Sequence, residues 1–239
     1  MEIRYFDTLE STNKYCKLLN PDEVEEFLVV WAATQTDGIG QAGNHWESEP
    51  DKNLTFSLIL KPTFLPAESQ YNLTMAIAVA VQKTVAELLP EEQVSIKWPN
   101  DIYVGDRKIC GILTSCQVMG SHISQAICGI GLNVNQILFP DWAPNPVSLC
   151  QIASREFDLD EVLKTVLEEI NGCYETLKTD SKCIREKYLS LLYRKGVETW
   201  YLYRGEPTRG TIEGVDPFGR LQLRRSDDST LLLCGMKEI

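Results

Sequence analysis

The chain has 239 residues, of which 44% are hydrophobic, enough apolar material for one large domain or a large domain with a small appendage. Its formal net charge of −11 argues against a nucleic-acid partner, because phosphates would be repelled wherever no basic patch intervenes. No apolar run approaches the roughly 18 residues of a membrane span, and no apolar signal core follows Met1, which predicts a cytoplasmic protein.

Eight cysteines are spread along the chain without any Cys-x-x-Cys pair, and the two histidines, His45 and His122, lie far apart in sequence. A zinc site is therefore not expected, because structural zinc needs closely spaced thiolate and imidazole ligands. Scattered cysteines in a cytosolic protein are most often buried free thiols. We expect them to behave as small apolar side chains.

The first ninety residues or so predict strands alternating with helices. Short apolar runs predict strands at residues 3–7, 27–33 and 54–60. A helix should begin within residues 9–13, where hydroxyl residues can cap it, and run to about residue 19. The segment 67–89 is apolar on most sides at its centre, which is typical of a helix buried against a sheet. A polar loop with three glycines fills residues 34–46.

The segment 94–104 resembles one apolar strand that is interrupted at Pro99, which cannot donate a hydrogen bond to a strand ladder. A cation, an amide and a carboxylate, from Lys97, Asn100 and Asp101, lie together at this kink. Burying such groups without partners costs several kcal/mol, so we expect polar groups to meet them. The alternative is an edge strand that ends in a solvated turn.

Beyond a hairpin turn at Gly105, strands are expected at residues 108–118 and 123–134, followed by helices at 146–153, 160–177 and 182–193. From about residue 197 the chain changes to short strands separated by glycine and aspartate, at 211–216, 220–223 and 230–233, a spacing typical of a small β-barrel. We therefore predict an α+β protein with two domains, 1–193 and 194–239.

Five polar or glycine-rich clusters lie beside the predicted strands: 11–13, Gln35 with the loop after it, 97–101, Lys108 with Gly111, and 131–133. Each alone has an ordinary explanation. A Ser-Thr-Asn run caps a helix, a glycine-rich loop makes a tight turn or an anion nest, and glycines within a strand mark close approach by backbone or ligand.

Taken together and in order, the clusters resemble the biotin protein ligase family over about residues 5–135. The strongest motif is Lys-Trp-Pro-Asn-Asp-Ile at 97–102, and the others are at 107–113, 38–46, 10–13 and 129–134. The resemblance implies a mixed β-sheet flanked by helices, similar to class II aminoacyl-tRNA synthetases, with a small SH3-like β-barrel at the C-terminus. The first 193 residues would form the catalytic domain, in a short form without an N-terminal DNA-binding domain.

The resemblance also implies a reaction in two steps. Biotin and Mg-ATP give biotinoyl-5′-AMP and pyrophosphate, and a lysine of a biotin carboxyl carrier domain then attacks the mixed anhydride. The first step joins two anions, which repel strongly in a dry site. The protein must therefore supply positive charge where they meet.

Matching residues take their roles from the resemblance. Lys97 would be the catalytic group, because its ammonium can bridge the biotin carboxylate and the α-phosphate. Biotin would contact Ser11, Thr12, Asn13, Gln35, Gly38, Ile39, Gly40, Gln41, Lys97, Trp98 and Gly111. ATP would contact Asn44, Trp46, Asn100, Asp101, Lys108 and Asn133, with the Asp101 carboxylate facing the magnesium ion.

The chain departs from the family pattern at Ile39, where the family normally has a loop arginine. An aliphatic side chain cannot replace this bidentate donor. The expected result is a working ligase that binds more weakly or releases its adenylate more readily. The alternative is a non-catalytic biotin-binding protein.

A second alternative is a lipoate or octanoate transferase of related fold, which would need an apolar channel for an extended acyl chain. A repressor role is not expected, because the chain is acidic and begins directly with its first predicted strand. The implied partners are biotin, ATP and a biotin carboxyl carrier protein, with no nucleic acid and no membrane. The oligomeric state is left open, a homodimer being one option.

Overall fold

The computed structural model describes residues 1–234 and 237–238. Its larger sheet has seven strands in the order β1-β2-β3-β7-β6-β5-β4. These strands are β1 (Glu2–Leu9), β2 (Leu28–Gln35), β3 (Leu54–Leu60), β4 (Val94–Lys97), β5 (Asp101–Val104), β6 (Arg107–Met119) and β7 (His122–Leu132). The β1–β2 pair is parallel and the other pairs are antiparallel.

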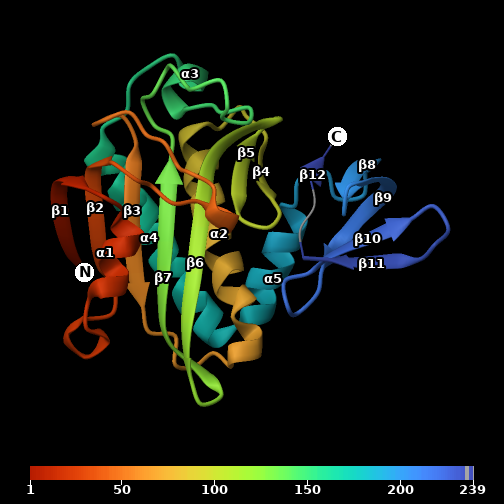
Figure 1. Ribbon diagram of the computed structural model, residues 1–239, viewed down its shortest axis with the longest axis horizontal. Coiled ribbons are helices and arrows are strands. Elements are labelled where there is room, and N and C mark those ends of the chain that lie inside the picture. Colours follow the sequence, from red (N-terminus) through yellow and green to blue (C-terminus); the bar gives the residue numbers. More distant parts are fainter. Residues whose placement is uncertain (235–236, 239) are drawn as a thin grey trace.

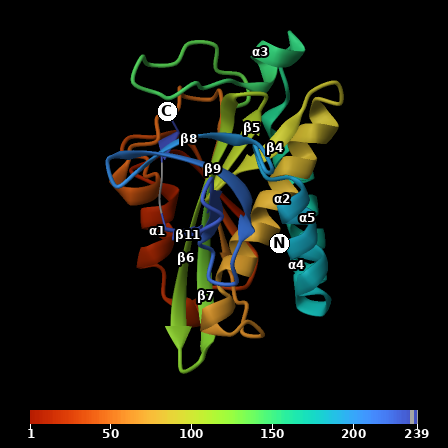
Figure 2. The same cartoon turned by 90° about the vertical axis from the view of Figure 1, so that its right-hand side faces the viewer.

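Helices cover both faces of this sheet. One face carries α1 (Thr12–Leu18), and the other carries α2 (Tyr71–Leu88), α4 (Leu159–Thr179) and α5 (Ser181–Ser190), as Figures 1 and 2 show. The short α3 (Leu149–Ala153) lies at one end, and 3-10 turns occur at η1 (Pro21–Glu23), η2 (Gln41–Gly43) and η3 (Ala67–Ser69). No helix among the described residues is both long and apolar enough to cross a membrane.

The core is built around β3, which is buried along its whole length. Because neighbouring side chains of a strand point to opposite faces, β3 contributes to two apolar clusters. Leu58 belongs to the large cluster that includes residues of α2 and α4, whereas Ile59 packs with Cys16 of α1 and with Leu28. The predicted burial of the long apolar helix is confirmed, since most of the centre of α2 is inaccessible to solvent.

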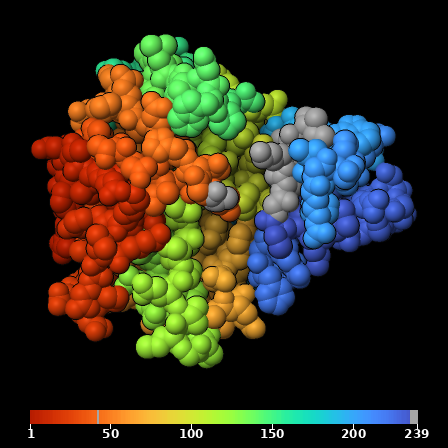
Figure 3. Space-filling view, viewed as in Figure 1, coloured from red at the N-terminus to blue at the C-terminus, as the bar shows by residue number. Residues whose placement is uncertain are grey.

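A second, antiparallel sheet follows α5 and forms the blue lobe in Figure 3. Its five strands, in the order β11-β10-β9-β8-β12, are β8 (Glu198–Tyr203), β9 (Glu206–Val215), β10 (Leu221–Arg225), β11 (Thr230–Leu233) and β12 (Lys237–Glu238). The α+β class is confirmed: a mixed sheet flanked by helices, with a small C-terminal antiparallel sheet. The predicted boundary at 193/194 falls between α5 and β8, and the division into two domains stays a prediction.

Two predicted helices were wrong at their ends, for the same reason. The helix expected from residue 146 begins at Leu149, because 145–147 instead bond to the backbone of Lys108 at the start of β6. The helix expected to reach residue 193 ends at Ser190, because Leu191 and Tyr193 bond to the backbone of Ile96 in β4. In both places a long-range backbone pairing replaces the last or first helical turn.

The cysteines are free thiols, as expected, but not all of them are buried. Cys16, Cys110, Cys128 and Cys150 are buried, whereas Cys183 and Cys234 are exposed. Burial raises the pKa of the Cys16 and Cys128 thiols to about 12. These two thiols are therefore protonated at neutral pH and behave as apolar side chains.

Replacing Leu58 with alanine should lower the free energy of unfolding by about 2–5 kcal/mol, because the side chain is fully buried in β3 and its removal leaves a cavity. Urea denaturation followed by circular dichroism measures the change. Leu18→Ala is the matched control, since Leu18 is 86% exposed and its truncation should change the stability by less than about 0.5 kcal/mol. Equal losses in the two variants would contradict this description of the core.

Candidate functional site

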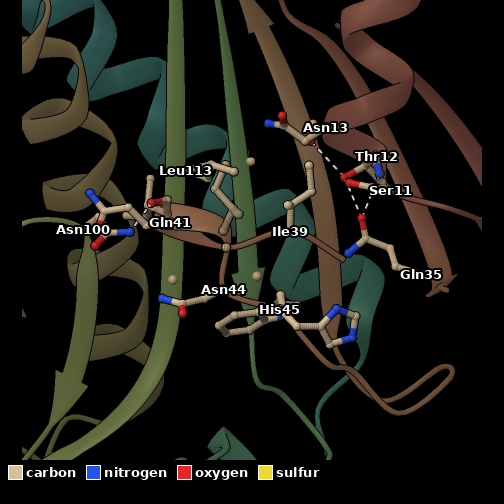
Figure 4. Close-up of a pocket in the computed structure, with 18 of the residues that line it drawn as sticks. Ser11, Thr12, Asn13, Gln35, Ile39, Gln41, Asn44, His45, Asn100 and Leu113 are labelled. Atoms are coloured by element: carbon tan, nitrogen blue, oxygen red, sulfur yellow. Dashed lines mark hydrogen bonds between the residues drawn. The ribbon is translucent and has the colours of Figure 1, made fainter. Parts of the chain in front are cut away.

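A pocket lies on the α1 face of the large sheet, beneath the loop that follows β2 (Figure 4). Its free volume is about 140 Å³. The lining comes from the start of α1, the loop and strands β3, β5, β6 and β7. These residues are Ser11, Thr12, Asn13, Gln35, Ile39, Gly40, Gln41, Asn44, His45, Trp46, Phe56, Ser57, Asn100, Asp101, Lys108, Gly111, Ile112, Leu113, Gly129, Ile130 and Gly131.

One end of the pocket is a network of neutral polar groups. The Thr12 backbone N–H and hydroxyl both donate to Oε1 of Gln35, at 2.7 and 3.2 Å. The Thr12 hydroxyl also lies 2.9 Å from the Ser57 hydroxyl. Because the single Thr12 proton is directed to Gln35, the Ser57 hydroxyl must be the donor of that second bond. The Gln35 amide nitrogen therefore remains available as a donor to a ligand.

Asn13 extends this polar end. Its side chain is buried, and within the described part of the chain neither its amide nitrogen nor its oxygen has a hydrogen-bond partner. A buried amide without partners is costly, so it marks a place where a ligand supplies the missing bonds. Gly129 gives it room, since a Cβ there would lie 3.1 Å from the Asn13 nitrogen. Ser11 caps α1 by accepting from the Lys14 N–H, which holds all three residues at the pocket.

The floor of the pocket is a pair of glycines under an indole ring. Gly111 of β6 and Gly131 of β7 are register partners. A Cβ at Gly131 would lie 2.4 Å from the Trp46 ring, and one at Gly111 would lie 3.0 Å from it. The ring therefore rests flat against the strands, and its N–H is buried with no partner among the described residues. At Gly131 a Cβ would displace the ring, and at Gly111 it would press against the ring.

The glycine-rich loop closes over the pocket as a small hairpin. The Trp46 N–H donates to the Gly38 carbonyl at 2.9 Å, and Ile39 pairs with His45. Lys14 of α1 holds the loop through an ion pair with Asp37 at 2.5 Å. Gly38 itself does not line the pocket, whereas the Ile39 side chain points into it (Figure 4). Ile39 therefore puts an aliphatic surface in the pocket, as expected from its replacing the usual loop arginine of the family.

The other end of the pocket holds its charged groups. The Lys108 ammonium lies 2.8 Å from Oδ1 of Asp101 and 5.5 Å from the Trp46 ring centre. Burial raises the pKa of the Asp101 carboxyl, and the charge of Lys108 opposes this shift. Asn100 donates its side-chain N–H to the Ile112 carbonyl at 2.7 Å, which fixes its orientation. Lys108 is the only lysine or arginine among the described residues that line the pocket.

Four expected site residues do not line the pocket: Gly38, Lys97, Trp98 and Asn133. Lys97 is on the same sheet face as Asp101, but its ammonium lies 3.3 Å from the Tyr103 hydroxyl and outside the pocket lining. Trp98 is not a pocket wall, because its indole N–H donates to the Gly219 carbonyl of the C-terminal sheet at 2.9 Å. Asn133 is buried and donates to the Val147 carbonyl.

Several lining residues were missed from the sequence: His45, Phe56, Ser57, Ile112, Leu113, Gly129 and Ile130. Ser57 had a detectable signal, since it is the hydroxyl residue at the centre of the apolar run Leu-Thr-Phe-Ser-Leu-Ile-Leu. Its neighbours Leu58 and Ile59 are fully buried. A polar side chain that alternates toward the same face as Ile59 therefore indicated a ligand or a buried partner there.

The pocket offers few protein ligands for a metal ion. Among residues 1–234 and 237–238, no group of three or more histidine, cysteine, aspartate and glutamate side chains could hold one. Asp101 supplies the carboxylate of the lining, and its neighbour is an ammonium. This set fits magnesium only where a bound phosphate chain supplies the other oxygens, which is the usual way that Mg²⁺ binds with nucleotides.

The chain is similar, in structure and in sequence, to several proteins named as ligases. The structure is similar to a biotin protein ligase from Aquifex aeolicus in complex with biotin and ATP, with a TM-score of 0.84 and 26% identity over 100% of this chain and 99% of that one. The chain is 37% identical to the bifunctional ligase/repressor BirA of Bacillus subtilis over 166 residues, 68% of this chain and 50% of the relative. It is 26% identical to the biotin–[acetyl-CoA-carboxylase] ligase of Mycobacterium tuberculosis over 205 residues, 82% of this chain and 73% of the relative.

The chain thus spans about half the length of the Bacillus relative that it matches. The biotin/lipoate A/B protein ligase family model matches residues 5–133, which carry α1, the glycine-rich loop and every residue that lines the pocket. On this match over more than half of its length, the chain belongs to the biotin/lipoate A/B protein ligase family.

Proposed function

We propose that the chain is a biotin protein ligase, which adenylates biotin with Mg-ATP and transfers it to a lysine of a biotin carboxyl carrier domain. The observation that carries the proposal is a single pocket with neutral polar groups at one end and a lysine, a carboxylate and an amide at the other. The likeness to a ligase in complex with biotin and ATP supports it.

The polar end suits the ureido ring of biotin, which has one carbonyl and two N–H groups. The amide nitrogens of Gln35 and Asn13 supply donors for the carbonyl, and the oxygens of Asn13 and Ser57 supply acceptors. A fatty acyl chain offers no partners for these groups, so they would stay buried and unsatisfied. This cost favours biotin over octanoate at the polar end.

The charged end suits the step in which two anions are joined. We assign this step to Lys108 in place of Lys97, because Lys108 reaches the pocket and Lys97 does not line it. Its ammonium would lie between the biotin carboxylate and the α-phosphate, where it offsets their repulsion and the charge that develops in the transition state. The Trp46 ring beside it would exclude water from the same region.

Asn100 and Asp101 would face the phosphates of ATP. Magnesium, bound through those phosphates with Asp101 as the protein ligand, would neutralise part of their charge. Lys108 would then exchange its ion pair with Asp101 for the reacting oxygens. The net charge of −11 supports the further proposal that the protein has no nucleic-acid partner.

Mass spectrometry of the purified chain with biotin, ATP and magnesium tests the function. We expect biotinoyl-5′-AMP, and a biotin-sized mass increase on the acceptor lysine of an added carrier domain. A parallel reaction with lipoate in place of biotin separates the two branches of the family. Modification by lipoate alone would identify a lipoate transferase, and binding of biotin without any adenylate would identify a non-catalytic biotin-binding protein.

Lys108→Met should slow biotin-dependent exchange between pyrophosphate and ATP by about 10²- to 10³-fold, the usual loss when one preorganised donor to a developing charge is removed. Methionine keeps most of the length of the side chain and removes its charge. Lys97→Met is the matched variant, with the same change two strands further toward the sheet edge, on β4 instead of β6. A larger loss for Lys97→Met than for Lys108→Met would return the catalytic role to Lys97.

Ile39→Arg should tighten binding of the adenylate by about 10- to 150-fold, because a hydrogen bond to a charged group contributes about 1.5–3 kcal/mol. The arginine would also slow escape of the adenylate from the pocket. Titration calorimetry with a stable adenylate analogue measures the affinity. Leu18→Arg adds the same charge at an exposed position outside the pocket and should leave the affinity unchanged. Equal affinities in the Ile39→Arg and wild-type proteins would refute the interpretation of Ile39.

A further inference from the structure

The turn between β9 and β10 of the C-terminal sheet contacts the segment that leads into the charged end of the pocket. The Trp98 indole donates to the Gly219 carbonyl at 2.9 Å. Gly219 has φ +84, and a Cβ on it would lie 2.4 Å from Cδ2 of Tyr71 at the start of α2. The turn therefore packs with its bare backbone against the Tyr71 ring, and the C-terminal sheet meets Trp98 and Tyr71 at one place.

This turn is held firmly by its own hydrogen bonds. The buried Asp216 carboxylate accepts from the backbone N–H groups of Phe218 and Arg220, both at 2.9 Å, and from Nε of Arg220 at 2.7 Å. Arg185 of α5 donates to the carbonyls of Val215 and Asp216. The turn thus presents a fixed surface to the Tyr71 ring.

Tyr71 links the turn at Gly219 to the segment that lines the pocket. Its hydroxyl donates to the Pro99 carbonyl at 3.0 Å and lies 2.9 Å from the Tyr188 hydroxyl. Since its one proton goes to Pro99, the Tyr188 hydroxyl is the donor of the second bond. Burial raises the pKa of Tyr71 well above its usual value, so it is a neutral donor at all physiological pH values.

The Pro99 carbonyl, which accepts from Tyr71, is part of the peptide bond that joins Pro99 to Asn100. On the other side, Asn100 is fixed by β6, since its carbonyl accepts from the Ile112 N–H at 2.8 Å and its side chain donates to the Ile112 carbonyl at 2.7 Å. Asn100 and Asp101 are therefore clamped between β6 and the Tyr71 hydroxyl. Neither Tyr71 nor Gly219 lines the pocket.

We infer that Tyr71 is a positioning residue for the nucleotide: its bond to the Pro99 carbonyl fixes Asn100 and Asp101, and the Gly219 turn holds the Tyr71 ring in place. The C-terminal sheet thereby contributes to the affinity for ATP, although none of its described residues lines the pocket. The biotin end depends on α1, Gln35 and Ser57, which lie on other elements, so its affinity does not depend on this contact. The inference rests on the proposed function, because it takes ATP as the ligand at this end.

Tyr71→Phe tests the inference, because phenylalanine keeps the ring on Gly219 and removes only the hydroxyl. Titration calorimetry should show about 3- to 10-fold weaker binding of ATP, the range for loss of one neutral hydrogen bond, with unchanged binding of biotin. The Michaelis constant for ATP in pyrophosphate exchange should rise by the same factor, and that for biotin should not. Tyr188→Phe is the matched control: it removes a hydroxyl one bond further away and leaves the Pro99 bond in place, so ATP binding should change less than about twofold.

Gly219→Ala approaches the same contact from the C-terminal sheet, because the added methyl group presses on the Tyr71 ring. It should also weaken ATP selectively, with biotin binding as the internal check that the large sheet is intact. The inference is overturned if Tyr71→Phe and Tyr188→Phe weaken ATP equally, or if ATP and biotin weaken together in Tyr71→Phe or Gly219→Ala. A wild-type chain that binds neither ligand refutes the proposed function itself and the positioning role with it.

Discussion

The structure depends on the absence of side chains at one point of the sheet. Gly111 and Gly131 face each other across β6 and β7, and the Trp46 ring lies so close that a Cβ at Gly131 would be 2.4 Å from it. This bare patch is what allows a flat group to lie on the strands between the polar and the charged ends of the pocket. The glycine-rich loop, the capped start of α1 and the kink at Pro99 are all arranged around its edges.

The electrostatics of the pocket follow from its shortage of cations. A single lysine among the described lining residues balances a single carboxylate, so the pocket has little charge of its own before ligands arrive. Two anionic substrates brought there would be held mainly by one ammonium, by magnesium carried with the nucleotide and by backbone N–H groups. Ile39 adds apolar surface to this arrangement, which makes the contrast between the neutral and charged ends sharper.

Much of the fold could be predicted from local pattern. The strand over 54–60 was placed correctly because most of its residues are apolar, and the break at Pro99 because proline cannot donate to a strand ladder. The conformation of segments 145–147 and 191–193 could not be predicted in this way. Their composition suits a helix, and their backbone partners, Lys108 and Ile96, are distant in sequence. Only the folded chain decides between a last helical turn and a backbone bond to a remote strand.

The same limit applies to the site. The sequence favoured Lys97 as the catalytic group and gave Lys108 as a contact of ATP, although both lie in motifs beside a strand. The choice between them depends on the Tyr103 ring, which lies 4.6 Å from the Lys97 ammonium at the sheet edge. Trp98 gave no sequence signal of its role, because its partner is the carbonyl of Gly219, 121 residues away.

The pairing of residues 191–193 with β4 also has a mechanical consequence. The segment that leads to the C-terminal sheet is itself bonded to the large sheet. Ile96 exchanges two backbone hydrogen bonds with Leu191 and Tyr193, directly before the kink at residues 97–99. A force that pulls on the chain after Tyr193 would therefore act directly on the edge strand β4. Bending of the chain before Tyr193 would require separating these residues from β4.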